Sequence, residues 1–268
     1  MTHVPMGASM VKGQFGLPFS TELTTRYPNL VPQGISAELI AEKWNISRED
    51  MDRFGLQSQE RAARATAEGR FQAEILPVLD SEGRLMTTDE GIRDSTYEKV
   101  SSLKPSFIEA EKGGKVTAAN SSQITDGSSA ILIMSEEKAK QLGLKPRARF
   151  VNFSVAGADP RLMLTAPIPA TAKVLERAGL RIEDMDLVEI NEAFAAQVIP
   201  SAKHLGISWD KLNVKGGGIA LGHPFGMTGA RIMTTLLNAL EDENKTIGME
   251  TMCVGGGQGM AMIVERLN

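Results

Sequence analysis

The sequence has 268 residues, of which 42% are hydrophobic, enough to bury the core of one large or two ordinary domains. Its formal net charge of -4 gives no general attraction to nucleic acid or anionic lipid, and no stretch of about eighteen apolar residues argues for a membrane span. The single cysteine, Cys253, excludes an internal disulfide and favours a reducing, cytoplasmic setting, and no Cys/His cluster has the spacing of a metal site.

From Ser36 to about Gly114 the sequence contains mainly helical patterns and irregular connections, with few strand-like segments. Ser47-Arg-Glu-Asp50 resembles a capping box, so we expect a helix that begins there, passes through Phe54 and Ala62, and ends at Gly69. This stretch is rich in polar residues, which predicts a solvent-rich subdomain appended to the rest of the chain.

Beyond Gly114, short apolar runs alternate with helices that end in glycine, and this alternation predicts an α/β sheet. The expected strands are 130–134, 148–155, 186–190 and a final pair around 251 and 260–264. The expected helices are 170–178, 192–205 and 226–240. The glycine-rich turn 255–259 predicts either a hairpin or a place where a ligand approaches the main chain.

The first motif is Asn191-Glu-Ala-Phe-Ala-Ala196, at the junction between an expected strand and an expected helix. Ligands usually bind at the carboxyl ends of strands in α/β sheets, so Asn191 is a candidate site residue. Taken alone, the motif favours the simpler interpretation that Asn191 is the N-cap of the helix.

The second motif is Gly216-Gly-Gly-Ile-Ala-Leu-Gly-His223-Pro224. Glycine-rich loops before helices often bind phosphate, but a dinucleotide fingerprint needs glycine at Leu221, and a P-loop needs Lys and then Ser or Thr after its last glycine. A neutral His223 offers instead a fixed ring nitrogen that can donate to a carbonyl oxygen. A histidine merely satisfied in a loop is equally compatible with this motif alone.

The third motif is Cys253-Val-Gly-Gly-Gly257, at the end of an expected strand. Free cysteine is among the most buried residue types, so an inert core position is the simpler interpretation. A thiol beside N–H groups exposed by glycine, and near a histidine, would instead have a lowered pKa and carry protons.

Together, in this order and spacing, the three motifs resemble the C-terminal signature blocks of the thiolase family. Further similar segments are 103–107, 116–130 and 167–180, so the resemblance covers essentially the whole chain and is greatest to the degradative, fatty-acid β-oxidation type. It implies a thiolase fold in three parts: a loop domain over 1–114, the last strand and helix of the N-terminal half over 115–147, and the C-terminal thiolase domain over 148–268.

The resemblance implies an acyl-CoA:acetyl-CoA C-acyltransferase, which carries out 3-oxoacyl-CoA thiolysis or the reverse condensation through an acyl-cysteine. Cys253 would be the acid-base thiol that exchanges the α-proton of the acetyl unit. His223 would polarise the thioester oxygen and help to hold the nucleophile as thiolate, while Asn191 would position a water in the same oxyanion site. The Gly255 N–H would contribute to a second oxyanion hole.

Four residues match the family's CoA pocket. Phe107 and Ala118 would lie against the adenine and pantetheine, Ser122 near the pantetheine amides, and Phe194 at the acyl end. Coenzyme A is a substrate, and no other cofactor is expected. The expected partners are CoA and acyl-CoA, together with further copies of the chain or a separate N-terminal half.

Two departures from the family pattern stand out. Pro32-Gln33 precede Gly34 where biosynthetic members have a His-Met pair, which argues against short-chain acetoacetyl specificity. Thiolases carry their nucleophilic cysteine upstream of the segment where this chain starts, and Cys253 cannot be both nucleophile and proton carrier. We therefore expect the isolated polypeptide to be inactive, with an apolar face left uncovered.

The alternative hypothesis is a non-catalytic CoA- or lipid-binding scaffold subunit, or an inactive fragment. Binding alone would not require Asn191, His223 and Cys253 together, which argues against the scaffold.

Overall fold

The computed structural model describes residues 20–267, so the start of the predicted loop domain, 1–19, lies outside the described residues. The helices are α1 (Thr21–Arg26), α2 (Gln33–Lys43), α3 (Arg48–Ala67), α4 (Tyr97–Ser101), α5 (Glu136–Gln141), α6 (Pro167–Ala178), α7 (Ala195–Leu205), α8 (Gly218–Leu221) and α9 (Thr228–Asp242). Single 3-10 turns are η2 (Ala110–Lys112), η3 (Ala118–Asn120), η4 (Met163–Thr165) and η5 (Ile182–Asp184). A two-residue ladder pairs β1 (Val78–Leu79) with β2 (Leu85–Met86).

The main sheet confirms the predicted α/β class. Its order is β3-β6-β5-β4, with β3 (Ala148–Gly157), β4 (Leu187–Ile190), β5 (Ile247–Val254) and β6 (Gln258–Arg266). The strand β6 is antiparallel to both of its neighbours, whereas β4 and β5 run parallel. Gly256 and Gly257 adopt positive φ angles in the turn between β5 and β6, so the hairpin is the correct interpretation of this glycine run.

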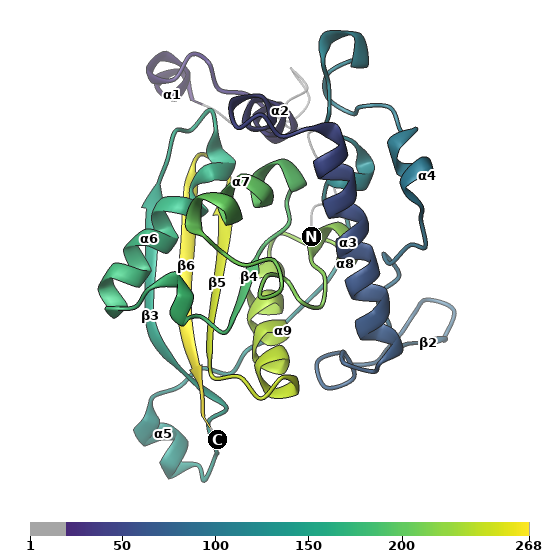
Figure 1. The fold of residues 1–268 in the computed structure, drawn as a ribbon. Helices are drawn as coiled ribbons and strands as arrows, with labels where there is room; N and C mark the ends of the chain where they lie inside the picture. Colours follow the sequence, from purple (N-terminus) through teal and green to yellow (C-terminus); the bar gives the residue numbers. More distant parts are fainter. Residues whose placement is uncertain (1–19, 268) are drawn as a thin grey trace.

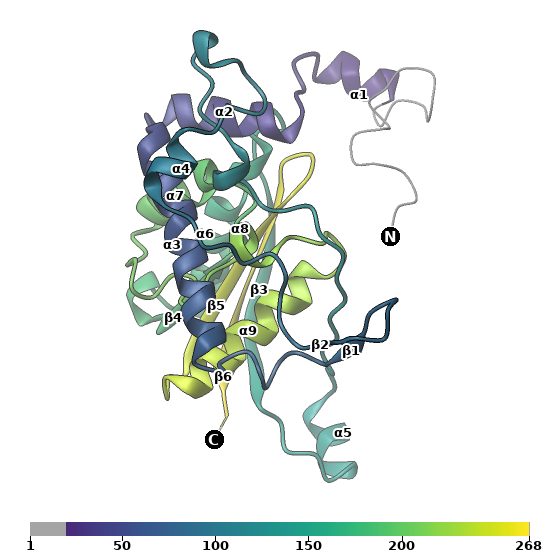
Figure 2. The same ribbon diagram turned by 90° about the vertical axis from the view of Figure 1, so that its right-hand side faces the viewer.

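Helices cover both faces of the sheet, with α6 and α7 on one side and α9 on the other (Figures 1 and 2). Met249, Cys253 and Ile263 belong to the large core cluster that includes α6 and α7. Leu187 and Val264 point the other way and pack with Leu236 and Leu240 of α9 in a smaller cluster. Successive side chains of a strand point to opposite faces of the sheet, so β4 and β6 contribute to both clusters.

The helix α3 begins at the predicted capping box, in which Ser47 accepts from the Asp50 N–H and the Asp50 side chain accepts from the Ser47 N–H. The prediction of a solvent-rich, appended subdomain is wrong. Met51 and Phe54 are part of the main core cluster. Small residues along α3 let it approach other backbone closely: a Cβ at Gly55 would lie 2.1 Å from the Ala119 carbonyl oxygen.

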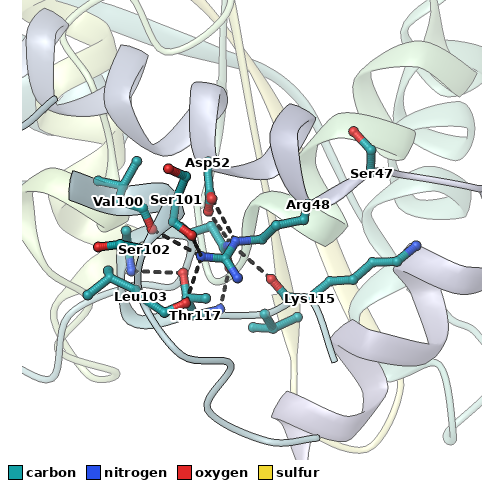
Figure 3. A network of polar contacts seen from close by, with 12 residues as sticks. Ser47, Arg48, Asp52, Val100, Ser101, Ser102, Leu103, Lys115 and Thr117 are labelled. Atoms are coloured by element: carbon teal, nitrogen blue, oxygen red, sulfur yellow. Dashed lines mark hydrogen bonds and ion pairs between the residues drawn. The ribbon is translucent and has the colours of Figure 1, made fainter. Parts of the chain in front are cut away.

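A network around Arg48 joins α3 to the segment that follows α4 (Figure 3). The Arg48 guanidinium donates to Asp52 at 2.6 Å, to the Val100 carbonyl at 3.0 Å and to the Leu103 carbonyl at 2.9 Å. Asp52 is fully buried and also accepts from Asn120 at 2.8 Å. Because every charge here has a hydrogen-bonding partner, the network fixes the segment 100–120 against α3.

The prediction of a strand over 130–134 is wrong, because this segment has no regular secondary structure. A strand requires a neighbour that completes its backbone hydrogen bonds, and none of the described strands pairs with this segment. Leu132 and Ile133 are consequently exposed. The other predicted strands and helices are confirmed, with ends shifted by a few residues.

One part of the sheet is uncovered on the α9 side, as predicted. Phe153 and Val155 of β3 are 67% and 64% exposed and stand opposite Met262 and Met260 of β6. These four residues, with Glu250 of β5 opposite Met262, are called the open face below. The α9 helix covers β4 and β5 but leaves this apolar strip to solvent.

Candidate active site

Asn191 lies at the carboxyl end of β4 and faces His223. Its backbone N–H donates to the Thr251 carbonyl of β5 at 3.0 Å, and its side-chain Nδ2 lies 3.2 Å from His223 Nε2. The helix α7 starts only at Ala195, with Phe194 as its N-cap, so the interpretation of Asn191 as an N-cap is wrong. The structure therefore brings the first and second motifs into direct contact.

The ring of His223 is held on several sides. Its backbone N–H donates to the Gln123 carbonyl at 3.2 Å, its Nδ1 lies 2.6 Å from Thr228 Oγ1, and the Phe225 ring packs edge-on with centroids 5.2 Å apart. Burial, and after it the positive charge of Arg231, lowers the pKa of His223 to about 4. The imidazole is consequently neutral near pH 7.

Cys253 stands near the carboxyl end of β5, two residues beyond Thr251, and is 8% exposed. Burial raises the pKa of its thiol to about 12, so the prediction of a lowered pKa is wrong. The thiol packs among apolar residues of the main core cluster, and burial in such surroundings disfavours the thiolate. A thiol of this kind rests protonated and is suited to give a proton to a strongly basic carbon.

The glycine run of the second motif is packed against protein. A Cβ at Gly216 would lie 2.5 Å from the Ser58 carbonyl oxygen, and a Cβ at Gly217 would lie 2.5 Å from the carboxyl carbon of Glu192. These glycines are needed for the close approach of α3 and of Glu192, which agrees with the rejection of a phosphate-binding loop.

Glu192 is a residue whose importance the sequence reasoning missed. It is 1% exposed and accepts hydrogen bonds from Ser58 Oγ at 2.6 Å, Asn213 Nδ2 at 2.9 Å and the Ile219 N–H at 3.2 Å. Burial raises its pKa, and these hydrogen bonds oppose the rise. The one available signal was a carboxylate at the start of an otherwise apolar helix, since such a group is buried only when it has partners.

Three of the four predicted CoA-pocket residues lie together. The rings of Phe107 and Phe194 meet edge to face with centroids 6.0 Å apart, and the Ser122 N–H donates to the Ala193 carbonyl at 2.9 Å. A Cβ at Gly34 would lie 2.2 Å from the Phe107 ring, so this glycine makes room for it. Ala118 is exposed at the start of η3.

Gly255 is exposed at the start of the turn between β5 and β6. A Cβ placed there would lie 3.9 Å from the side-chain nitrogen of Gln33. Gln33 occupies one of the two positions at which the sequence departs from the biosynthetic pattern, so that departure lies next to the candidate second oxyanion hole.

Within residues 20–267, no group of three or more His, Cys, Asp or Glu side chains could hold a metal ion. Among the helices described, none is both long and apolar enough to cross a membrane.

Comparison with known proteins identifies relatives of both parts of the chain. The family model described as "Thiolase, N-terminal domain" matches residues 1–137, and "Thiolase, C-terminal domain" matches residues 144–266. A 3-ketoacyl-CoA thiolase of Psychrobacter cryohalolentis is 52% identical over 241 residues, which are 87% of this chain and 61% of that protein. A 3-ketoacyl-CoA thiolase of Vibrio parahaemolyticus is 48% identical over 275 residues, covering 99% of this chain and 68% of that protein.

A solved structure, the acetyl-CoA acetyltransferase of Bacillus anthracis, superposes with a TM-score of 0.85 at 42% identity, over 96% of this chain and 67% of that one. The present chain thus has the fold of that protein. It spans 61% to 68% of the length of the two bacterial relatives above.

Proposed function

Because the chain belongs to the thiolase family, we propose that it supplies the acid-base and oxyanion-binding half of an acetyl-CoA C-acyltransferase. The observation that carries the proposal is the contact of 3.2 Å between Asn191 Nδ2 and His223 Nε2. The Asn191 backbone N–H also donates to the carbonyl of Thr251 on β5, two residues before Cys253. Asn191 and His223 touch, and Cys253 follows Thr251 by two residues on β5, so all three lie toward the carboxyl ends of the parallel strands β4 and β5, where ligands of α/β sheets usually bind.

In the thiolysis direction, the leaving acetyl-CoA departs as an enolate that needs a proton on carbon. The protonated thiol of Cys253 donates that proton, and its thiolate then takes one from the thiol of the incoming CoA. A raised thiol pKa makes the resting group an acid and the transient thiolate a strong base, which fits a weakly acidic α-carbon. His223 and a water held by Asn191 stabilise the oxygen on which negative charge develops.

The acyl group needs a second thiol. The sequence contains one cysteine, and Cys253 is assigned to proton transfer, so the nucleophile comes from outside these 268 residues. We accordingly keep the prediction that this polypeptide alone does not turn over.

The contact between Phe107 and Phe194, with Ser122 tied to Ala193, supports a CoA site on this side of the molecule. The names of the two bacterial relatives favour 3-ketoacyl-CoA substrates. We also propose that the protein acts in fatty-acid β-oxidation, is cytoplasmic and forms homo-oligomers.

The test is a 3-oxoacyl-CoA thiolysis assay of the chain alone and after addition of a polypeptide that supplies the N-terminal part of a thiolase. We expect no turnover alone and CoA-dependent thiolysis in the mixture. Cys253→Ser should lower kcat of the mixture by about a hundredfold or more. Turnover by the isolated chain, or full activity of Cys253→Ser, would contradict the assignment of Cys253.

A further inference from the structure

Thr228 contacts the side of the His223 ring that faces away from Asn191. Thr228, the first residue of α9, is fully buried, and its Oγ1 lies 2.6 Å from His223 Nδ1 and 2.8 Å from the Pro224 carbonyl oxygen. A threonine hydroxyl has one proton to donate. The two contacts therefore cannot both be donated by Thr228.

Only one arrangement of protons satisfies both contacts. A carbonyl oxygen can only accept, so the hydroxyl must donate to Pro224, and the hydroxyl oxygen must then accept from an Nδ1–H of His223. The opposite arrangement would place two oxygens 2.8 Å apart with no hydrogen between them. The Pro224 carbonyl also accepts from the Met227 and Thr228 N–H groups at 3.0 Å each, so the opposite arrangement is disfavoured by the repulsion between two facing oxygen lone pairs and not by an unsatisfied carbonyl.

The same tautomer fits the other side of the ring. With the proton on Nδ1, Nε2 carries a lone pair, which accepts from the Asn191 amide nitrogen 3.2 Å away. Asn191, His223, Thr228 and Pro224 then form one chain of three hydrogen bonds that all run in the same direction.

From this chain we infer that Thr228 is a positioning residue that holds His223 in the Nδ1–H tautomer, so that Nε2 enters the reaction as an acceptor. This revises the expectation that the neutral ring donates to a carbonyl oxygen. Nε2 first takes the proton of the nucleophilic thiol: the S–H bond breaks and an Nε2–H bond forms. The resulting imidazolium, with Nδ1–H still bonded to Thr228, can then donate from Nε2 to the substrate oxygen.

The tautomer can be measured on the chain as it is, without any activity. The sequence has only three histidines, His3, His204 and His223, and a His223→Asn variant assigns the signals in a long-range ¹H–¹⁵N spectrum of chain labelled with ¹⁵N-histidine. At pH 7 we expect a protonated Nδ1 and an unprotonated Nε2 in the wild type and in Thr228→Ser. In Thr228→Val, which keeps the shape but lacks the hydroxyl, protonation should move partly or wholly to Nε2.

A wild type protonated on Nε2 would overturn the inference, as would an unchanged Nδ1–H in Thr228→Val. A cooperative urea unfolding transition, followed by circular dichroism, verifies that each variant is folded. If Thr228→Val does not fold, the wild-type spectrum still decides the tautomer.

A kinetic arm rests on the proposed function. In the completed enzyme, Thr228→Val should lower kcat about tenfold to a hundredfold with little change in KM, as loss of a histidine-orienting partner does elsewhere, and Thr228→Ser should retain most of it. An unchanged kcat in Thr228→Val would count against the positioning role. Absence of turnover in the wild-type mixture would count against the proposed function and leave the spectroscopic result standing.

Discussion

Two regions of the same sheet differ in how they are completed. At the motif edge, formed by Asn191, Glu192, His223 and Thr228, most polar side-chain atoms find partners on α3 and in the glycine-rich loop, and only Asn191 Oδ1 has none among the described residues. On the open face, the side chains of Phe153 and Val155 are exposed to solvent. Glu250 is buried there, and its Oε2 has no hydrogen-bond partner among the described residues.

The two regions differ in whether their side chains have partners within the described residues. Hydrogen bonds between distant segments orient Asn191 and His223, and Cys253 is held by packing in the main core cluster. The open face gains nothing comparable, and contiguous exposed apolar surface of this kind usually marks an interaction site. Substitutions at the motif edge should therefore lower the free energy of unfolding, whereas substitutions of exposed residues on the open face should mainly change self-association.

At the motif edge, the largest loss of stability is expected when Glu192 is replaced. Glu192→Ala removes the acceptor of three buried donors, on Ser58, Asn213 and Ile219, so we expect the free energy of unfolding in urea to fall by about 3 kcal/mol or more. Glu192→Gln keeps one acceptor oxygen in the same shape and should cost less. A loss below about 1 kcal/mol in Glu192→Ala would show that the network is not needed for the fold.

The open face should make stability depend on pH through Glu250. Burial raises the pKa of Glu250 to about 8, and it raises that of Glu189, its partner on β4, to about 8 as well, while the charge of Arg231 opposes both shifts. A carboxyl whose folded pKa lies above its ordinary value of 4.5 is stabilising at low pH, and that contribution is lost as pH rises to about 8.

Between pH 6.5 and 8, each of these two carboxyls should lower the free energy of unfolding by up to about 1.4 kcal/mol per pH unit. Glu250→Gln should reduce the slope, because it removes one of the titrating carboxyls and also one of the charges that raise the pKa of Glu189. This window avoids His223, whose lowered pKa has the opposite sign and acts between about 4 and 6.5. Urea unfolding at several pH values measures the slope, and an equal slope in Glu250→Gln would refute the assignment to Glu250.

The same division explains what could be predicted from the sequence. The helix α3 and the strands β3 to β6 follow from local patterns, because capping residues and apolar periodicity act within a few residues. The segment 130–134 has an equally good strand pattern, but a strand also needs a neighbour, and local pattern carries no information on whether one is there.

The motif residues of the site could be predicted from the sequence, but their contacts could not. Asn191, His223 and Cys253 stand in recognisable motifs, and the structure places Asn191 against His223. Thr228 and Glu192 act through contacts made only after folding, and the sign of the Cys253 pKa shift depends on burial. None of these three could be obtained from spacing alone.

The smallest effect on stability is expected at Phe153 on the open face. Phe153→Ser removes a ring that is 67% exposed, so the free energy of unfolding should change by less than about 0.5 kcal/mol, while self-association measured by light scattering should decrease. The matched control is Phe54→Ala on α3, where the ring is 7% exposed and the loss should be about 3 kcal/mol or more. If Phe153→Ser proved as costly as Phe54→Ala, the β3 ring would have to be covered in solution, and the open face would already have an occupant.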